Sequence, residues 1–295
     1  MQKLEKEKIA HSTLECIYER ETEVNLFYKW LFERDQKIHK DRVYQWFPEL
    51  NNIHENKGSL SKAEIISKID DAVIKFRERY ADNIKTAETN IIAELPEIEL
   101  GIKLLENLMG ETVHFKYLVM PSVYPICPFD VKRNLFYFTI VRVAEGTVRF
   151  DGLSSTALHE ISHFIFFRQI ANIPNKLSDR GIHHLKEVLT PVLLQQPNIL
   201  GYRKEKNICG NPESISYQVG VDGRVISIFD YVNEEYNKNP TPEGYMTFLV
   251  WLIALFEKVQ PEILKRDKLY AENARGIFVK DSELNKQFVE PIKIT

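Results

Sequence analysis

The chain has 295 residues, of which 44% are hydrophobic and 27% are charged, and its formal net charge is −3. This composition is typical of a globular protein with one large or two ordinary domains and ample core. The slightly negative balance creates no basic surface field, so nucleic acid is not an expected partner.

Cysteine usage and hydropathy indicate a cytoplasmic protein. Cys16, Cys127 and Cys209 are odd in number, widely separated and without C-x-x-C spacing, so neither a disulfide framework nor a thiolate zinc site is expected. The charged N-terminus precedes no apolar signal core, and the most apolar run, Phe248–Phe256, is too short to span a bilayer. We therefore expect no membrane span, while signal-less secretion stays compatible with the sequence.

Residues 1 to about 110 form the first predicted region, which is helical. Apolar residues recur at helical spacing in Leu4–Glu21 and in Glu23–Trp46. The polar stretch Asn51–Ser59 predicts a loop.

A capping signature then opens a long helix. Ser61 and Glu64 have capping-box spacing, and the apolar pattern continues from there toward Leu95. Pro96 predicts the start of another helix, and Gly110 is a suitable residue for its end.

A β region is predicted between Gly110 and the next helix. Thr112–Met120 and Leu135–Val143 favour strands, and Thr147–Phe150 would return as the hairpin partner of the second one. Ser154 or Ser155 is then the expected N-cap of a helix that is apolar nearly all the way round, which indicates a buried helix.

This helix contains the sequence His159-Glu160-Ile-Ser-His163, an H-E-x-x-H motif. In a helix, the two histidines project from one face, one turn apart, so both imidazoles can bind one Zn²⁺. Glu160 stands beside them and can act on a metal-bound water. Catalytic zinc sites use three protein ligands, so a third ligand must follow in the chain.

Further elements follow the motif. Ile182–Leu194 predicts a second helix, Val225–Phe229 a short strand, and Thr241-Pro242 another helix start. The predicted fold class is α+β and mainly helical, with residues 1–110 as the helical region and 111–295 as a second domain. Helical segments at Pro242–Phe256, Pro261–Ala274 and Ser282–Val289 would make a C-terminal subdomain of about 241–295.

The motif resembles that of the zincin metallopeptidases. The metzincin branch requires a glycine and a third histidine where this chain has Phe166 and Gln169, so that branch is excluded. The gluzincin branch, typified by thermolysin, takes a glutamate from a second helix. Glu187 lies 24 positions after His163 (187 − 163) and resembles that ligand, although Pro191 stands where such enzymes have an orienting aspartate.

Other residues stay open as candidates for the site. Helical geometry places Glu187, His183 and His184 away from the apolar stripe of their helix, so His183, His184 and Asp179 remain alternative ligands, and the two histidines could instead contact the substrate. The resemblance also implies a substrate-binding edge strand, here Leu135–Val143 or its partner, and an oxyanion-stabilising tyrosine or histidine. The tyrosine candidates are Tyr202, Tyr217, Tyr231 and Tyr236.

These features predict a zinc-dependent metallopeptidase that hydrolyses a peptide or protein substrate. His159, His163 and Glu187 would hold the zinc, and Glu160 would be the general base toward a metal-activated water. The alternatives are a binding or regulatory protein on a zincin scaffold, and a protein in which the histidines are ordinary hydrogen-bonded core residues. The intact Glu160 speaks against the first alternative, because only catalysis requires it.

Overall fold

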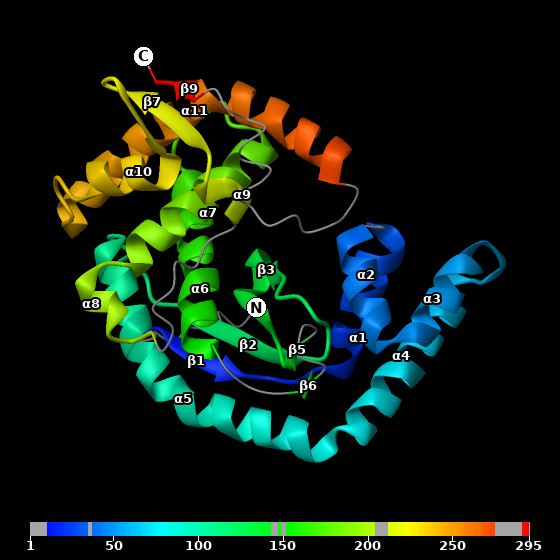
Figure 1. Cartoon of the computed structure of the whole chain (residues 1–295). Coiled ribbons are helices and arrows are strands. Elements are labelled where there is room, and N and C mark those ends of the chain that lie inside the picture. Colours follow the sequence, from blue (N-terminus) through cyan, green and yellow to red (C-terminus); the bar gives the residue numbers. More distant parts are fainter. Residues whose placement is uncertain are drawn as a thin grey trace, which may run out of the picture. The chain divides into compact units, whose positions relative to one another are not determined.

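The computed structural model describes residues 11–34, 37–142, 147–148, 152–203, 212–274 and 291–294. Over these residues the protein is mainly helical with small sheets, which confirms the predicted α+β class (Figure 1). None of the helices in the described ranges is both long and apolar enough to cross a membrane.

The chain divides into two compact units, each built from separate stretches of sequence. The first unit comprises Met1–Ser12, Leu100–Phe115 and Leu158–Thr295, and the second comprises Thr13–Glu99 and Lys116–Ala157. Two of the divisions between these stretches fall inside helices, α5 (Ala81–Leu108) and α6 (Leu153–Ile170).

The second unit combines helices with two sheets. Its helices are α1 (Arg20–Tyr28), α2 (Lys37–Trp46), α3 (Pro48–Glu55), α4 (Lys62–Arg79) and the larger part of α5 (Ala81–Leu108), with a π-helical turn at Lys29–Glu33 and 3-10 turns at Lys57–Ser59 and Val131–Arg133. Its strands are β1 (Thr13–Cys16), β2 (Lys116–Ser122), β3 (Phe129–Asp130), β4 (Leu135–Thr139), β5 (Val141–Arg142) and β6 (Thr147–Val148).

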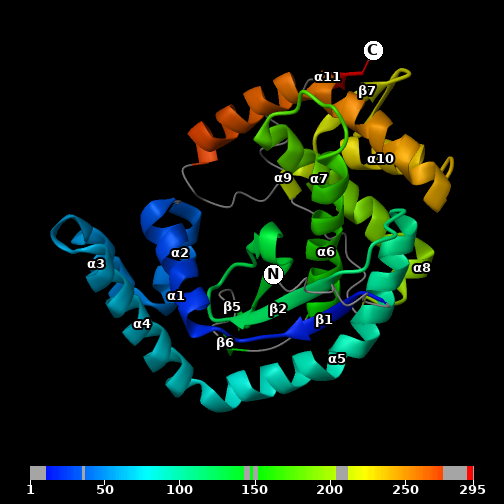
Figure 2. The same ribbon diagram turned by 180° about the vertical axis from the view of Figure 1, so that it is seen from behind.

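The larger sheet has the strand order β1-β2-β4-β3, and both views show β1 beside β2 (Figures 1 and 2). β1 and β4 pair with β2 in parallel, whereas the short β3 pairs with β4 antiparallel. The expectation of a free edge along Leu135–Val143 is therefore wrong for β4, which has a neighbour on each side. The predicted hairpin exists one strand later, where Val141 of β5 pairs with Val148 of β6.

Three predictions of local structure need correction. The segment Leu4–Glu21 contains strand β1, because its backbone groups pair with β2, a partner about a hundred residues away that local periodicity cannot reveal. The predicted loop Asn51–Ser59 begins as the end of α3, which Pro48 starts at its first position and which buries Leu50. Pro96 lies inside α5 and does not start a new helix.

Other local signals are confirmed. Ser61 caps α4: its hydroxyl accepts from the Glu64 N–H at 3.3 Å, and the Glu64 carboxylate accepts from the Ser61 N–H at 2.7 Å. Gly110 has φ +64°, the left-handed conformation that commonly ends a helix. The N-cap prediction for the motif helix, by contrast, is wrong: α6 starts at Leu153, so Ser154 and Ser155 lie inside its first turn.

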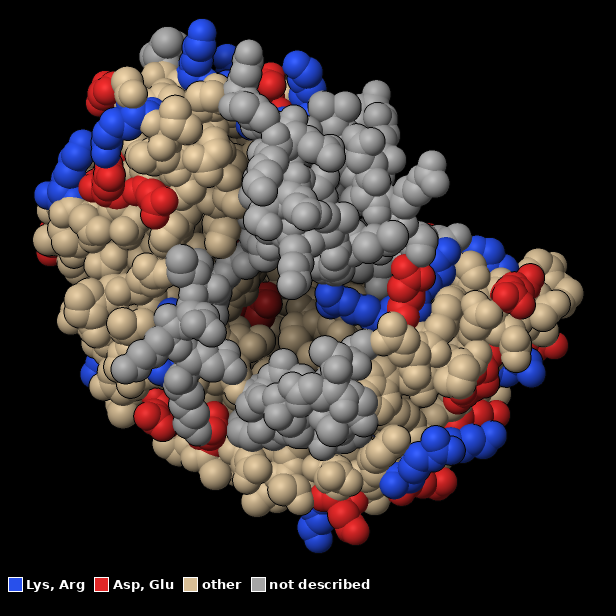
Figure 3. Space-filling view, in the orientation of Figure 1, with Lys and Arg blue, Asp and Glu red and all other residues tan. Residues whose placement is uncertain are grey.

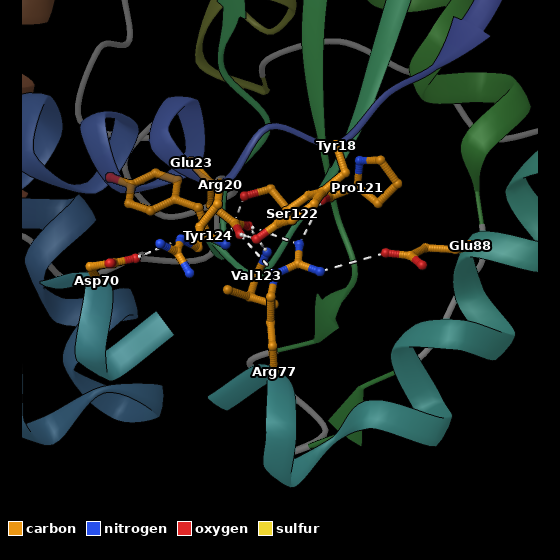
Figure 4. Close-up of polar contacts among 10 residues, drawn as sticks. All are labelled: Tyr18, Arg20, Glu23, Asp70, Arg77, Glu88, Pro121, Ser122, Val123 and Tyr124. Carbon is orange, nitrogen blue, oxygen red and sulfur yellow. Dashed lines mark hydrogen bonds and ion pairs between the residues drawn. The ribbon is translucent and has the colours of Figure 1, made fainter. Parts of the chain in front are cut away.

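A buried ion pair ties the helices of the second unit to its sheet (Figure 4). The fully buried Glu23 of α1 accepts from Arg77 Nε of α4 at 2.9 Å and from the Val123 N–H after β2 at 2.7 Å. The Tyr18 hydroxyl also donates to Glu23 at 3.2 Å, and the Arg77 guanidinium stacks 3.9 Å from the Tyr18 ring. Glu88 of α5 lies 3.5 Å from Arg77 on the other side. The buried carboxylate thus has several donors, which buried charges require.

The first unit is built around α6 (Leu153–Ile170) and α7 (Asp179–Leu194). Its other helices are the end of α5, α8 (Pro197–Leu200), α9 (Pro212–Ile215), α10 (Ile228–Tyr236) and α11 (Pro242–Ala274), and β7 (Gln218–Val221) lies between β8 (Arg224–Ser227) and β9 (Ile292–Lys293). α7 packs against α10 and α11.

α11 begins as predicted and ends later. The Gly244 N–H donates to the Thr241 hydroxyl at 3.1 Å, which confirms Thr241 as the N-cap. The helix continues through Pro261 to Ala274, so the segment predicted as separate at Pro261–Ala274 belongs to it. The predicted helix Ser282–Val289 lies outside the described residues.

Charged side chains of both signs intermingle over the described part of the face in Figure 3, as expected for a net charge of −3.

Candidate metal centre

Helix α6 presents the two motif histidines on one side. His159 and His163 are one turn apart, and their ring centroids lie 4.4 Å from each other. The neighbouring side chains of Leu158, Ile161 and Ile165 are fully buried, which confirms the expected core position of this helix. His163 is 1% exposed, whereas the His159 side chain is 16% exposed and marks the more accessible end of the pair.

Helix α7 brings Glu187 to these histidines. The Glu187 Oε2 lies 3.7 Å from His159 Nε2, and its Oε1 lies 3.5 Å from His163 Nε2. One ligand atom from each of the three residues can be chosen so that all lie within 4.8 Å of one another. Glu187 is only 7% exposed, so the polar side of α7 at this point is an internal surface and not a solvated one.

The three donors fit a zinc ion in kind and lie near enough to converge on one ion. Two imidazole nitrogens and one carboxylate oxygen are a usual catalytic zinc set, and donors on a tetrahedral zinc lie roughly 3.3 Å apart. The carboxylate of Glu187 approaches each histidine with a different oxygen, and one ligand atom from each residue lies within 4.8 Å of the other two, so the side chains must close in slightly around an ion. Lys186 contacts two of the atoms that would bind the metal: its ammonium donates to Glu187 Oε1 and lies 3.0 Å from His163 Nε2. An ion between the ligands therefore requires the Lys186 side chain to turn aside.

The protonation states of the cluster suit metal binding. Burial, together with the neighbouring Lys186 charge, holds the pKa of His163 well below its ordinary value, so its imidazole is neutral. Burial alone would raise the pKa of Glu187, but the charge of the adjacent Lys186 holds it well below its ordinary value, so its carboxylate is ionised. A neutral imidazole and an ionised carboxylate are the forms that bind metals.

A chain of hydroxyl groups orients His163. Its Nδ1 lies 3.2 Å from Thr190 Oγ1, Thr190 Oγ1 lies 2.7 Å from Ser162 Oγ, and Ser162 donates to the His159 carbonyl at 2.7 Å. Because Lys186 can only donate, the His163 Nε2 must be an acceptor and Nδ1 must carry the hydrogen. The donations then run from His163 to Thr190 to Ser162 to His159, and the Nε2 lone pair accepts from Lys186 beside Glu187.

Glu160 lies beside the ligands without a hydrogen-bond partner for one of its oxygens. It is 7% exposed, and its buried Oε2 accepts from none of the described residues. Burial raises the pKa of Glu160 to about 8; the charge of Lys186 acts to lower it and that of Glu187 to raise it. A buried polar atom with no partner is costly in a purely structural role.

The remaining candidates are distributed around this cluster. His184 is fully buried, and its nitrogens lie 2.8 Å from Ser214 Oγ and 2.7 Å from Asp267 Oδ2, so both are engaged away from the ligand group. His183 has a buried Nε2 without a partner in the described chain, but it is outside the group of three, as is Asp179 at the start of α7.

The candidate tyrosines have other neighbours. Tyr217 donates to Asp267 at 2.7 Å, and Tyr202 packs beside Gly101 of α5. Tyr231 packs edge-on against Trp251, and Tyr236 packs edge-on against Phe248. Lys186, Thr190 and Ser162 were not among the sequence candidates. Thr190 could have been found from its position three residues after Glu187, which puts both side chains on adjacent parts of one helix face.

No protein-family model, curated protein or solved structure matches this chain. The residues of the cluster and their geometry therefore carry the functional argument.

Proposed function

We propose that the protein is a zinc-dependent metallopeptidase of the zincin type, with His159, His163 and Glu187 as the metal ligands. The convergence of these three donors within 4.8 Å is the observation that carries the proposal. Their order, two histidines on one helix and a glutamate on the next, resembles the gluzincin arrangement. We place the protein in the cytoplasm, because its widely spaced cysteines do not form a disulfide framework and are typical of a reducing compartment.

Glu160 is the residue that the motif offers as a general base. Zinc, when bound, supplies a Lewis acid that polarises a carbonyl and acidifies water. The Glu160 Oε2 is not committed to any described donor, and a bound metal ion would favour its ionised carboxylate, which can take the proton of the attacking water and deliver it to the leaving amine nitrogen. His163 is held by Thr190 through Nδ1, which leaves its Nε2 directed to the ligand group.

Substitution of the base and of a ligand tests the proposal. Glu160→Gln should keep about one zinc per chain and slow the hydrolysis of a mixed fluorogenic peptide library by about 10²–10⁴-fold. His163→Ala should lose the zinc, and Glu234→Gln, in an exposed ion pair with Arg224, should change neither property. Zinc content is measured by elemental analysis, and hydrolysis by fluorescence.

Two results would contradict the proposal in different ways. A wild-type protein that binds no zinc would show that the histidines are ordinary core residues. A zinc-loaded protein whose Glu160→Gln variant hydrolyses peptides at the wild-type rate would show that Glu160 is not the general base. A zinc-loaded protein that cleaves no peptide would favour the binding or regulatory alternative.

A further inference from the structure

A second buried polar cluster lies at the N-terminal half of α7, the helix that carries Glu187, and joins this helix to α11. Asp267 of α11 accepts from His184 Nε2 at 2.7 Å and from Arg180 Nε at 2.6 Å, both on α7. The Tyr217 hydroxyl donates to its other oxygen at 2.7 Å, and the other nitrogen of His184 contacts Ser214 at 2.8 Å. One carboxylate thus joins two successive turns of α7.

The charge state of this cluster supports a strong contact. Burial would raise the pKa of Asp267, but the hydrogen bonds from His184, Arg180 and Tyr217 hold it well below its ordinary value. The carboxylate is therefore ionised and can only accept, which makes its bonds charge-assisted. His184 is fully buried, and the Asp267 side chain is 14% exposed, so water competes little with these bonds.

The same face of α11 also holds the segment that leads into α7. Gln260 Oε1 accepts from the Ser178 N–H at 3.0 Å, and its Nε2 donates to the Lys176 carbonyl at 3.1 Å. Glu257 accepts from the Lys176 N–H at 2.5 Å. Contacts from α11 therefore follow the chain from Lys176 to His184.

We propose that Asp267 is a positioning residue for the third zinc ligand: it fixes the rotation and axial position of α7 so that Glu187 meets His159 and His163. Arg180 and His184 are four residues apart and therefore lie on one side of the helix. Glu187 follows one turn after His184. A slide of one residue would move Glu187 by about 1.5 Å, while metal–ligand distances tolerate only about 0.2 Å. This inference rests on the proposed zinc site.

The test measures zinc affinity and ligand geometry in Asp267→Asn. The variant keeps the shape of the side chain and loses its charge, and we expect zinc binding to weaken by about 10–100-fold. The visible bands of bound Co²⁺, which report ligand geometry, should change as well. The matched control is Glu234→Gln, which breaks an ion pair of the same unit that lies on neither ligand helix, the one with Arg224 at 2.9 Å. It should leave affinity and spectrum unchanged.

A milder pair of variants keeps the test valid if Asp267→Asn does not fold. Tyr217→Phe removes one hydrogen bond to Asp267 and should weaken zinc binding by about threefold. Tyr236→Phe removes a buried hydroxyl that no described group bonds, and should not affect binding. If the wild type binds zinc and both Asp267 and Tyr217 variants bind it equally well with an unchanged Co²⁺ spectrum, the positioning role is wrong. A wild type without zinc would overturn this inference and the proposed function together.

Discussion

Replacement of Lys186 by methionine should tighten zinc binding, although Lys186 stabilises the protein without zinc. Its ammonium donates to Glu187 Oε1 and lies 3.0 Å from His163 Nε2, the same atoms that would hold the metal. Both side chains of the Lys186–Glu187 pair are less than a tenth exposed. Methionine has a similar length and no charge, so the substitution removes the competing cation with little change of packing.

The size of the effect follows from a thermodynamic cycle. Removing one partner of a buried ion pair costs about 3–5 kcal/mol, because the remaining charge is left uncompensated. This cost falls on the zinc-free protein. In the zinc-bound protein the Glu187 carboxylate is compensated by the ion, and we expect a loss of about 1 kcal/mol or less. The difference of about 2–4 kcal/mol corresponds to zinc binding that is roughly 30- to 1000-fold tighter.

Two measurements close this cycle. Urea denaturation gives the free energy of unfolding of wild type and Lys186→Met, each after removal of zinc with a chelator and each with saturating zinc. Competition with a coloured chelator gives the zinc dissociation constants. Lys265→Met, at a side chain that is 68% exposed, is the control and should alter neither quantity by more than about 0.5 kcal/mol. The reasoning is refuted if Lys186→Met weakens zinc binding, or if it destabilises the two forms equally.

Three further predictions concern other parts of the molecule. Thr190→Val removes the hydroxyl that contacts His163 Nδ1 and should weaken zinc binding by about tenfold in the same competition assay; unchanged affinity would exclude the orienting role. Glu23→Gln should lower the free energy of unfolding in urea by about 3–5 kcal/mol because it leaves Arg77 without its buried partner, whereas Glu234→Gln should cost less than about 1 kcal/mol. Burial, with help from the charges of Arg42 and Arg34, lowers the pKa of His39 from 6.5 to about 4. The unfolded chain therefore binds the extra proton between these pH values, so stability is complete above pH 6.5 and falls by up to about 3 kcal/mol toward pH 4. His39→Gln should flatten this decline in urea titrations, and an unaltered pH profile would show that His39 is not its source.

The sequence predicted the parts of this site that depend on spacing along one helix. His159 and His163 are four residues apart, and that spacing alone puts them on one face of α6. Glu187 was inferred from its distance along the chain and its place on a second helix, and the structure brings it within 3.5 Å of His163 Nε2. The N-caps Ser61 and Thr241 could also be predicted from the sequence, because each capping hydrogen bond joins residues that are only three positions apart.

The contacts that the sequence did not predict are those made by long side chains and by distant strands. Strand β1 forms because β2 is available as a partner, and no property of Thr13–Cys16 alone distinguishes it from a helix end. Lys186 adjoins Glu187 in sequence, where helical geometry would point it some 100° away. Its flexible chain nevertheless returns the ammonium to the Glu187 carboxylate, a result that only the packed site determines.

Helix α7 therefore makes contacts with α11 and with α6 through neighbouring parts of its surface. Arg180 and His184 face Asp267 of α11, Glu187 faces the histidines of α6, and Thr190 contacts His163 from about 120° around the axis from His184. These contacts are mutually dependent because the helix is rigid: a rotation that improved one would break the others. The positions of Glu187, of the Thr190 hydroxyl and of the residues that contact Asp267 are thus fixed together by the rotation and axial position of one helix. Substitutions at Asp267, which is distant in sequence from the motif, should therefore affect zinc binding as directly as substitutions at Thr190.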